Sequence, residues 1–131
     1  MFLNDPTFSY IKKALDIASL RADLIASNIA NADTPHYKAK HIPFKDVLQM
    51  EENALKLKTT NPRHIQIRED FSYLIKPSKD DYLERNDQNN VKLDTEMTML
   101  AKNTLLIKAL NAFERYKFNQ YKDIISSTRN V

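Results

Sequence analysis

The chain has 131 residues, of which 42% are hydrophobic and 28% charged, with a formal net charge of +3. This size and apolar content suit one folded domain over 1–131, and the modest charge lacks the sustained basic run of a nucleic-acid-binding arm. The absence of cysteine excludes disulfides and thiolate metal sites. No apolar stretch of about 20 residues is present, which excludes a transmembrane helix.

The first predicted element is a long helix over residues 5–33. Asp5 and Pro6 favour a helix start, because a carboxylate accepts free N–H groups and proline has none to leave unpaired. The apolar residues then alternate at spacings of three and four, the pattern of a coiled-coil seam. This seam contains Phe8, Ile11, Leu15, Ala18, Ala22, Ile25 and Ile29. The helix is therefore expected to pair lengthwise with another helix.

A polar run at 27–35 follows the seam, and the seam's spacing of three and four residues continues into it. It contains Asn28, Asn31, Asp33, Thr34 and Pro35. Asparagine side chains bond locally to the backbone or reach a neighbour, and Pro35 disfavours a helical conformation at Thr34. The helix is expected to end here, and on the chemistry of these residues alone an ordinary helix C-terminus explains the run.

Residues 34–92 are predicted to be irregular and to hang off the far end of the helix pair. Prolines at 35, 43, 62 and 77 prevent one long helix from crossing this region. A short helix is expected over about 44–57. The segments 65–68 and 71–75 have strand-like composition and predict a small β-hairpin or an extended arm. Residues 78–81 and 84–90 are interpreted as polar loop, with disorder in an isolated monomer left open.

The last predicted element is a helix over residues 93–129. Asp94 is a candidate N-cap and Glu96 is favourably placed in the first turn. Helix pairing is assigned to apolar positions on both long helices, namely Ile11, Leu15, Ile25, Ile29, Leu100, Ile107 and Leu110. Further apolar residues broaden that side of the second helix, so it is expected to contact more than one neighbour. The predicted fold is mostly α, with the two long helices paired as a coiled-coil-like hairpin.

Catalytic and ligand-binding patterns are missing from the sequence. His36, His41 and His64 lack a recognisable ligand set and are interpreted as solvated loop histidines. Asp80 and Asp81 have no third acid at the spacing of a calcium loop. Because there is also no phosphate loop, nucleophile elbow or carboxylate motif, we expect no enzyme activity, no cofactor and no metal.

Two sequence blocks together carry a family resemblance. The first reads Arg21-x-Asp23-x-Ile25-Ala26-Ser27-Asn28-Ile29-Ala30-Asn31-Ala32-Asp33-Thr34-Pro35-x-Tyr37-Lys38-Ala39-Lys40. The second reads Asn90-Val91-x-Leu93-Asp94-x-Glu96-Met97. Both resemble the signatures of bacterial flagellar axial proteins, which comprise rod, hook and associated subunits, and the form of the first block is most similar to proximal rod subunits. With the helices they introduce, the blocks cover about half of the chain.

The resemblance implies a structural subunit of the basal body rod, the drive shaft that transmits torque from motor to hook and filament. Its implied partners are further copies of itself, other rod subunits, the rod–ring adaptor protein and the export gate, without nucleic acid or a direct membrane span. It also implies type III export to the periplasm-spanning rod without a cleaved signal peptide, and the N-terminus lacks a secretory signal.

The roles of the family's motif residues can be assigned to the positions of this chain that match the motif. The resemblance assigns subunit contact and turn formation to Asn28, Asn31, Asp33, Thr34, Pro35 and Tyr37. It also identifies the residues of the second motif as Val91, Leu93, Asp94 and Glu96.

The chain departs from the family pattern at His36 and Gln88, where such proteins usually carry glycine. It contains no glycine at all, although average usage would give about nine. The turn at His36 is therefore either strained or different from that of its relatives. Near Gln88, a left-handed backbone would be tolerated best by Asn86, Asp87, Asn89 or Asn90.

Two other functional classes stay open on the sequence: a cytoplasmic helical chaperone or adaptor, and a module that binds single-stranded nucleic acid. Residues 114–122 interleave aromatic and cationic side chains, as a stacking surface does. On a helix, however, Phe113, Lys117 and Tyr121 share one side. Arg115 and Phe118 point elsewhere, so bases would find no continuous platform.

Overall fold

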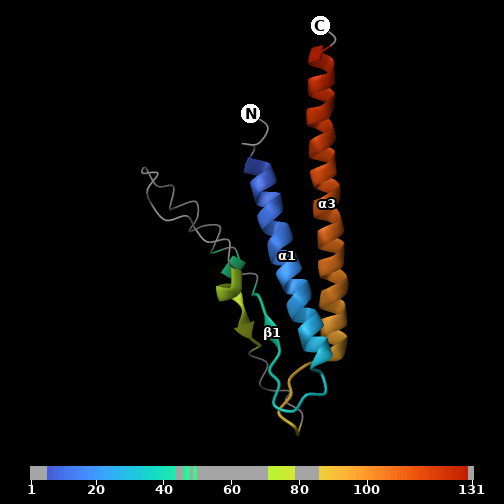
Figure 1. Cartoon of the computed structure of the whole chain (residues 1–131). Helices are drawn as coiled ribbons and strands as arrows, with labels where there is room; N and C mark the ends of the chain where they lie inside the picture. Colours follow the sequence, from blue (N-terminus) through green and yellow to red (C-terminus); the bar gives the residue numbers. More distant parts are fainter. Residues whose placement is uncertain (1–5, 44–45, 48, 50–70, 79–85, 130–131) are drawn as a thin grey trace, which may run out of the picture.

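The computed structural model describes residues 6–43, 46–47, 49, 71–78 and 86–129. The elements are, in chain order, helix α1 (Pro6–Ala30), strand β1 (Lys40–His41), the 3-10 helix η2 (Phe71–Leu74), strand β2 (Lys76–Pro77) and helix α3 (Leu93–Arg129). Two long helices pack together beside a small antiparallel sheet (Figure 1), so the predicted mostly α fold is confirmed. None of the described helices is long and apolar enough to cross a membrane.

The two long helices run antiparallel, as contacts along their length establish. The ring centroids of Phe8 and Tyr121 are 5.8 Å apart at one end. Asn103 Nδ2 donates a hydrogen bond to Ala18 O at 2.7 Å midway along the pair. With 37 residues against 25, α3 is about 18 Å longer than α1 at ~1.5 Å per residue. Its C-terminal end consequently extends past the start of α1 (Figure 1).

A seam with spacings of three and four residues runs along both helices. All seven seam positions predicted in α1 are buried or half-buried. On α3 the seam consists of Glu96, Leu100, Asn103, Ile107, Leu110, Glu114, Lys117 and Tyr121. Every member of it except Glu114 is buried or half-buried. Two polar members of this seam, Glu96 and Asn103, are 2% and 7% exposed. Apolar periodicity alone does not identify these two positions.

The N-cap of α3 differs from the predicted one. The helix begins at Leu93, so Asp94 lies inside its first turn and is not the N-cap. Glu96 N already donates a helical hydrogen bond to Lys92 O at 3.0 Å. Both carboxylates still lie at the helix end where the dipole favours negative charge.

The central arm forms its sheet from segments other than the predicted ones. Strands β1 and β2 are antiparallel, with Lys40 opposite Pro77 and His41 opposite Lys76. The strand predicted over 71–75 is wrong, because Phe71–Leu74 is a 3-10 helix that places its first and last apolar residues on one side. The segment 65–68 lies outside the described residues. Of the predicted helix over 44–57, residues 46, 47 and 49 are helical, and the remainder is likewise outside them.

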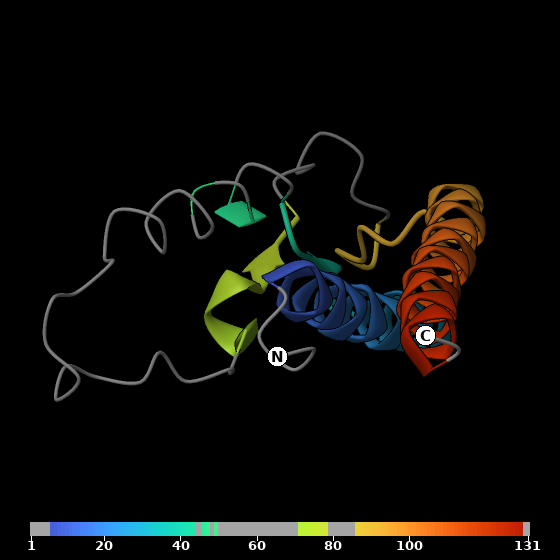
Figure 2. The ribbon, with the colours of Figure 1, turned by 90° about the horizontal axis from the view of Figure 1, so that it is seen from above.

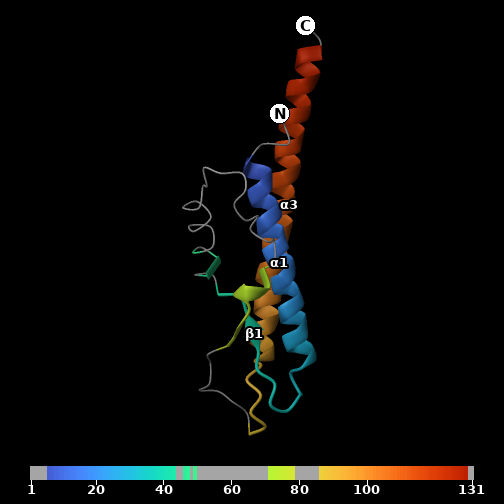
Figure 3. The same ribbon diagram turned by 60° about the vertical axis from the view of Figure 1, so that its left-hand side comes forward.

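The described part of the arm runs back along α1 and does not hang off the end of the helix pair (Figure 3). Seen along the helices, α1 lies between the arm and α3 (Figure 2). Ala39, Ile42 and Leu74 of the arm are 1%, 6% and 3% exposed, and Ile17, off the α1 seam, is 6% exposed. An ion pair of 2.6 Å joins Lys76 to Asp46 within the arm. Helix α1 therefore buries two sides, one against α3 and one against the arm.

The fold makes a direct prediction for Ile25, which is 6% exposed on the α1 seam. Ile25→Asp should lower the free energy of unfolding by about 4 kcal/mol or more, because it buries a charge without a partner. Ala26→Asp is the matched control, since the neighbouring residue is exposed on the same helix. Urea unfolding followed by circular dichroism measures both variants. Equal losses in the two would contradict the helix packing described here.

Candidate functional site

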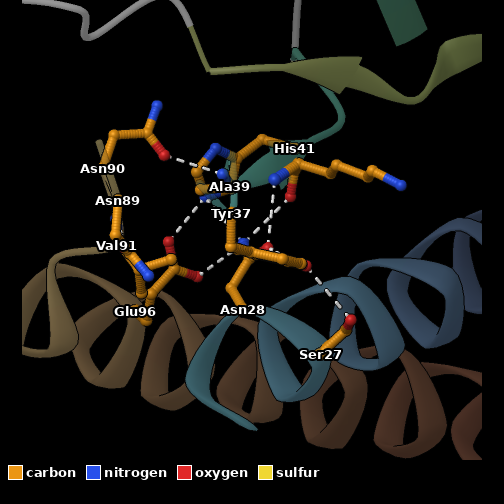
Figure 4. A network of polar contacts seen from close by, with 10 residues as sticks. Ser27, Asn28, Tyr37, Ala39, His41, Asn89, Asn90, Val91 and Glu96 are labelled. Atoms are coloured by element: carbon orange, nitrogen blue, oxygen red, sulfur yellow. Dashed lines mark hydrogen bonds and ion pairs between the residues drawn. The ribbon is translucent and has the colours of Figure 1, made fainter. Parts of the chain in front are cut away.

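Three segments meet at one end of the helix pair: the last turn of α1, the arm at 37–41, and the segment 86–96 that leads into α3 (Figure 4). They contain both blocks of the sequence resemblance. We call this meeting point the junction and describe it from its buried polar side chains outward.

Asn28 is the centre of the junction and is fully buried. Its Oδ1 accepts hydrogen bonds from Lys40 N at 3.0 Å and from Tyr37 Oη at 3.2 Å. Its Nδ2 donates to Lys40 O at 3.0 Å and to Glu96 Oε2 at 3.1 Å. These bonds use both donors and both acceptor sites of the side-chain amide. One side chain of α1 thereby holds the arm and α3 together.

Glu96 supplies a carboxylate that is 2% exposed. Its Oε1 lies 2.8 Å from His41 Nε2. Because an ionised carboxylate only accepts hydrogen bonds, the Nε2 atom of His41 must carry the hydrogen. The 3.4 Å approach of Asn28 Nδ2 to the same ring nitrogen then joins two donors and is not a hydrogen bond. The interpretation of His41 as a solvated loop histidine is therefore wrong.

The segment before α3 is tied to the helix exit by asparagine side chains. Asn89 is fully buried, and its Nδ2 donates to Asn31 O at 2.9 Å and to Thr34 O at 2.8 Å. Asn90 Oδ1 accepts from Ala39 N at 2.7 Å. The two asparagines of this segment are therefore structural, because their side chains bond to backbone groups of the helix exit and of the arm. Polar composition suggested a solvated loop because it does not reveal which backbone groups need a partner.

His36 and Gln88, the two residues that stand where family members usually have glycine, both adopt a left-handed backbone with φ of 61°. A non-glycine residue costs about 1–2 kcal/mol in this conformation. The two turns contact each other: His36 N donates to Asp87 O at 2.9 Å, and His36 Nδ1 lies 3.0 Å from Gln88 Oε1. The strained turn at His36 is thus observed, and near Gln88 the left-handed residue is Gln88 itself and not one of its asparagine or aspartate neighbours.

The remaining motif residues have local or surface positions. Asn31 Nδ2 donates to Ser27 O at 2.8 Å, and Thr34 Oγ1 donates to Asn31 Oδ1 at 3.1 Å. Val91 is buried, whereas Leu93 is 51% exposed. Asp33, Pro35 and Asp94 are also exposed. The motif therefore divides into residues that build the junction and residues that face outward.

The residues assigned to helix pairing lie on the seam. Ile11 and Ile25 are buried. Half-buried positions are held by Leu15, Ile29, Leu100, Ile107 and Leu110. Their pairing role stays a prediction, which the substitution at Ile25 tests.

Sequence reasoning missed four structural residues: His41, Asn89, Asn90 and Asn103. Only Asn103 had a usable signal, because it lies seven residues after Glu96 and continues the same spacing along α3. Within the described ranges, no group of three or more histidine, cysteine or acidic side chains is placed to hold a metal ion. The polar groups of the junction form hydrogen bonds mainly with one another. The junction therefore has a structural role.

The amide of Asn28 gives a test of the junction. Asn28→Asp replaces a donor with a carboxylate oxygen that faces Glu96 Oε2 and Lys40 O. We expect the free energy of unfolding to fall by about 3 kcal/mol or more. Asn31→Asp is the control, because its amide donates only to Ser27 O near the surface, and it should cost about 1 kcal/mol or less. Similar losses in both variants would argue against the central role of Asn28.

A double-mutant cycle tests the contact between the two left-handed turns. His36→Gly and Gln88→Gly each relieve backbone strain but remove the shared hydrogen bond, which the double variant loses only once. Urea unfolding of the three variants should therefore give a coupling of about 0.5–1 kcal/mol. Additive changes would show that the two turns do not support each other. Gln88→Ala should be less stable than Gln88→Gly, since alanine keeps the Cβ that opposes positive φ.

Comparison with known proteins is consistent with this geometry. The profile of the family described as "Flagella basal body rod protein" matches residues 13–38, which include the helix exit and Tyr37. The chain is 37% identical over 127 residues to the flagellar basal body rod protein FlgB of Bacillus subtilis, covering 96% of this chain and 98% of that protein.

Other relatives carry the same name. FlgB of Borrelia hermsii is 35% identical over 120 residues, with 85% of this chain and 89% of that protein covered. FlgB of Aquifex aeolicus is 30% identical over 114 residues, with 87% and 88% covered. These likenesses extend across the central arm as well as the two motif blocks. The chain therefore belongs to the FlgB family of flagellar basal body rod proteins.

Proposed function

We propose that this chain is a structural subunit of the flagellar basal body rod. The observation that carries the proposal is the near-full-length likeness to FlgB. The junction supports it, because both motif blocks are used to fix two long helices and an arm in one arrangement. A protein that transmits torque needs such fixed geometry more than it needs a reactive site.

The surface of the helix pair supports a role in assembly. On α3, large apolar side chains such as Leu105, Phe113, Tyr116 and Phe118 are 46–69% exposed. Exposed apolar surface of this extent is typical of protein–protein contact. We propose that it packs against further copies of this chain and other rod subunits, and that the rod also contacts the rod–ring adaptor protein and the export gate.

The proposed role does not require catalysis. The buried polar side chains of the junction serve the arm and α3, and none is arranged with a nucleophile or an open acid–base pair in the described part of the chain. We further propose that the subunit reaches the rod by type III export without cleavage of a signal peptide. Mass spectrometry of the N-terminus of rod-incorporated protein would check this last point.

Deleting the gene from the bacterium that encodes it tests the proposed function. We expect non-motile cells that lack complete basal bodies, and recovery of motility when the untagged gene is restored. The protein should then be detected in basal bodies purified from the complemented strain. Motile deletion cells with intact basal bodies, or a protein found only in the cytoplasm, would overturn the proposal.

A further inference from the structure

A second stripe with spacings of three and four residues runs along α3 beside the seam. This outer stripe consists of Met99, Lys102, Leu106, Ala109, Phe113, Tyr116, Gln120 and Asp123. Every member is exposed, and neither α1 nor the described arm covers it. Five of the eight residues are apolar, which is the composition and spacing that a further helix would pack against.

The first part of the outer stripe is one wall of a groove. Met99, Lys102 and Leu106 line it from α3, opposite Ile42 and Pro43 of the arm. Its base is formed by residues of α1, namely Arg21, Leu24 and Ile25. The groove has a volume of about 410 Å³ and is open to solvent along its length. It is therefore a mainly apolar depression with two cationic side chains.

The two cations of the groove have no anionic partner in the described part of the chain. Arg21 is half-buried, and its guanidinium donates to Ile42 O at 3.4 Å. Desolvation by burial lowers the pKa of Arg21 below its ordinary value. Because burial has desolvated this guanidinium, a carboxylate that approaches it from a neighbouring subunit would bind it favourably.

The far end of the same stripe has the complementary chemistry. Phe113 and Tyr116 are 46% and 58% exposed, and Asp123 follows them on the stripe. Tyr121 is level with Phe8 at the start of α1, so the last turns of α3 extend beyond α1 (Figure 1). At 100° per residue, the cation Lys122 is turned roughly 100° away from Asp123. This end of α3 thus presents aromatic side chains and one carboxylate on the outer stripe.

We propose that the end of the outer stripe of one subunit packs into the groove of a second copy, with Asp123 paired to Arg21 and Lys102. The two surfaces lie on different parts of the chain, so each subunit offers one and receives the other. Such a heterologous contact builds an open helical assembly when its rotation does not close into a ring, and a helical rod needs this open form. The inference rests on the proposed rod function and deepens it by naming the contacting surfaces and the ion pair.

Charge reversal in the full-length chain, expressed in the deletion strain, tests the contact. Asp123→Arg and Arg21→Glu should each abolish swimming and remove the subunit from purified basal bodies. The double variant Arg21→Glu/Asp123→Arg should recover both, because every interface again holds one charge of each sign. Lys122→Glu is the control, because Lys122 is exposed at the same helix end and is turned roughly 100° away from Asp123; this variant should swim normally.

The outcomes separate the two proposals. If the deletion strain itself swims, the rod function fails; if it does not swim but Asp123→Arg and Arg21→Glu both do, only the contact fails. No recovery in the double variant also overturns the contact, provided that thermal unfolding shows a folded protein. If Arg21→Glu does not fold, Lys102→Glu replaces it, since Lys102 is exposed.

Cross-linking provides a second measurement that does not depend on motility. The natural chain has no cysteine, so Leu106→Cys and Ile124→Cys introduced together are its only thiols. They are 18 positions apart on one helix, about 27 Å at ~1.5 Å per residue, and cannot join within a subunit. Oxidation in cells should give a ladder of oligomers if the groove receives the end of α3. Monomer alone, in cells that assemble rods, would contradict the proposed packing.

Discussion

The buried carboxylate of Glu96 is the constraint on which the rest of the arrangement depends. Removing an ionised carboxylate from water costs several kcal/mol unless donors replace the lost hydration. Here the donors come from two different segments, the Asn28 amide of α1 and the His41 ring of the arm. The charge is therefore compensated only when α1, the arm and α3 are all in place. A joint of this kind favours one arrangement over many similar apolar packings.

Helix α1 is the element that connects the others, since it has α3 on one side and the arm on the other (Figure 2). Its two apolar sides explain why a chain with a modest 42% hydrophobic content can still order an arm with little regular structure. The turns at His36 and Gln88 close this arrangement without glycine. Their mutual contact and the Asn89 bonds offset part of the backbone cost. The backbone strain at His36 and Gln88 thus lies at exposed residues, next to the buried hydrogen bonds of the junction.

The sequence allowed the helices to be predicted far better than the junction. Apolar residues at regular spacing report burial, so the α1 seam and the two long helices followed from it directly. Hydrogen-bond partners carry no such periodic signal. Asn28 was found through its family motif, but His41, the partner of Glu96, was interpreted as solvated, and Asn89 was assigned to a polar loop. The prediction of the strand positions was wrong for a related reason. Two-residue strands such as Lys40–His41 depend on tertiary contacts and not on intrinsic propensity.

The position of the junction in the chain also determines when the protein folds. Asn28 and Glu96 are 68 residues apart, and Ala18 and Asn103 are 85 apart. During synthesis at about 5–20 residues per second, α1 therefore exists for several seconds before its partner helix has emerged. Its apolar seam is unpaired throughout that interval, and closing so long a loop slows the pairing further. Helix α1 can therefore complete its packing only after most of the chain has been made.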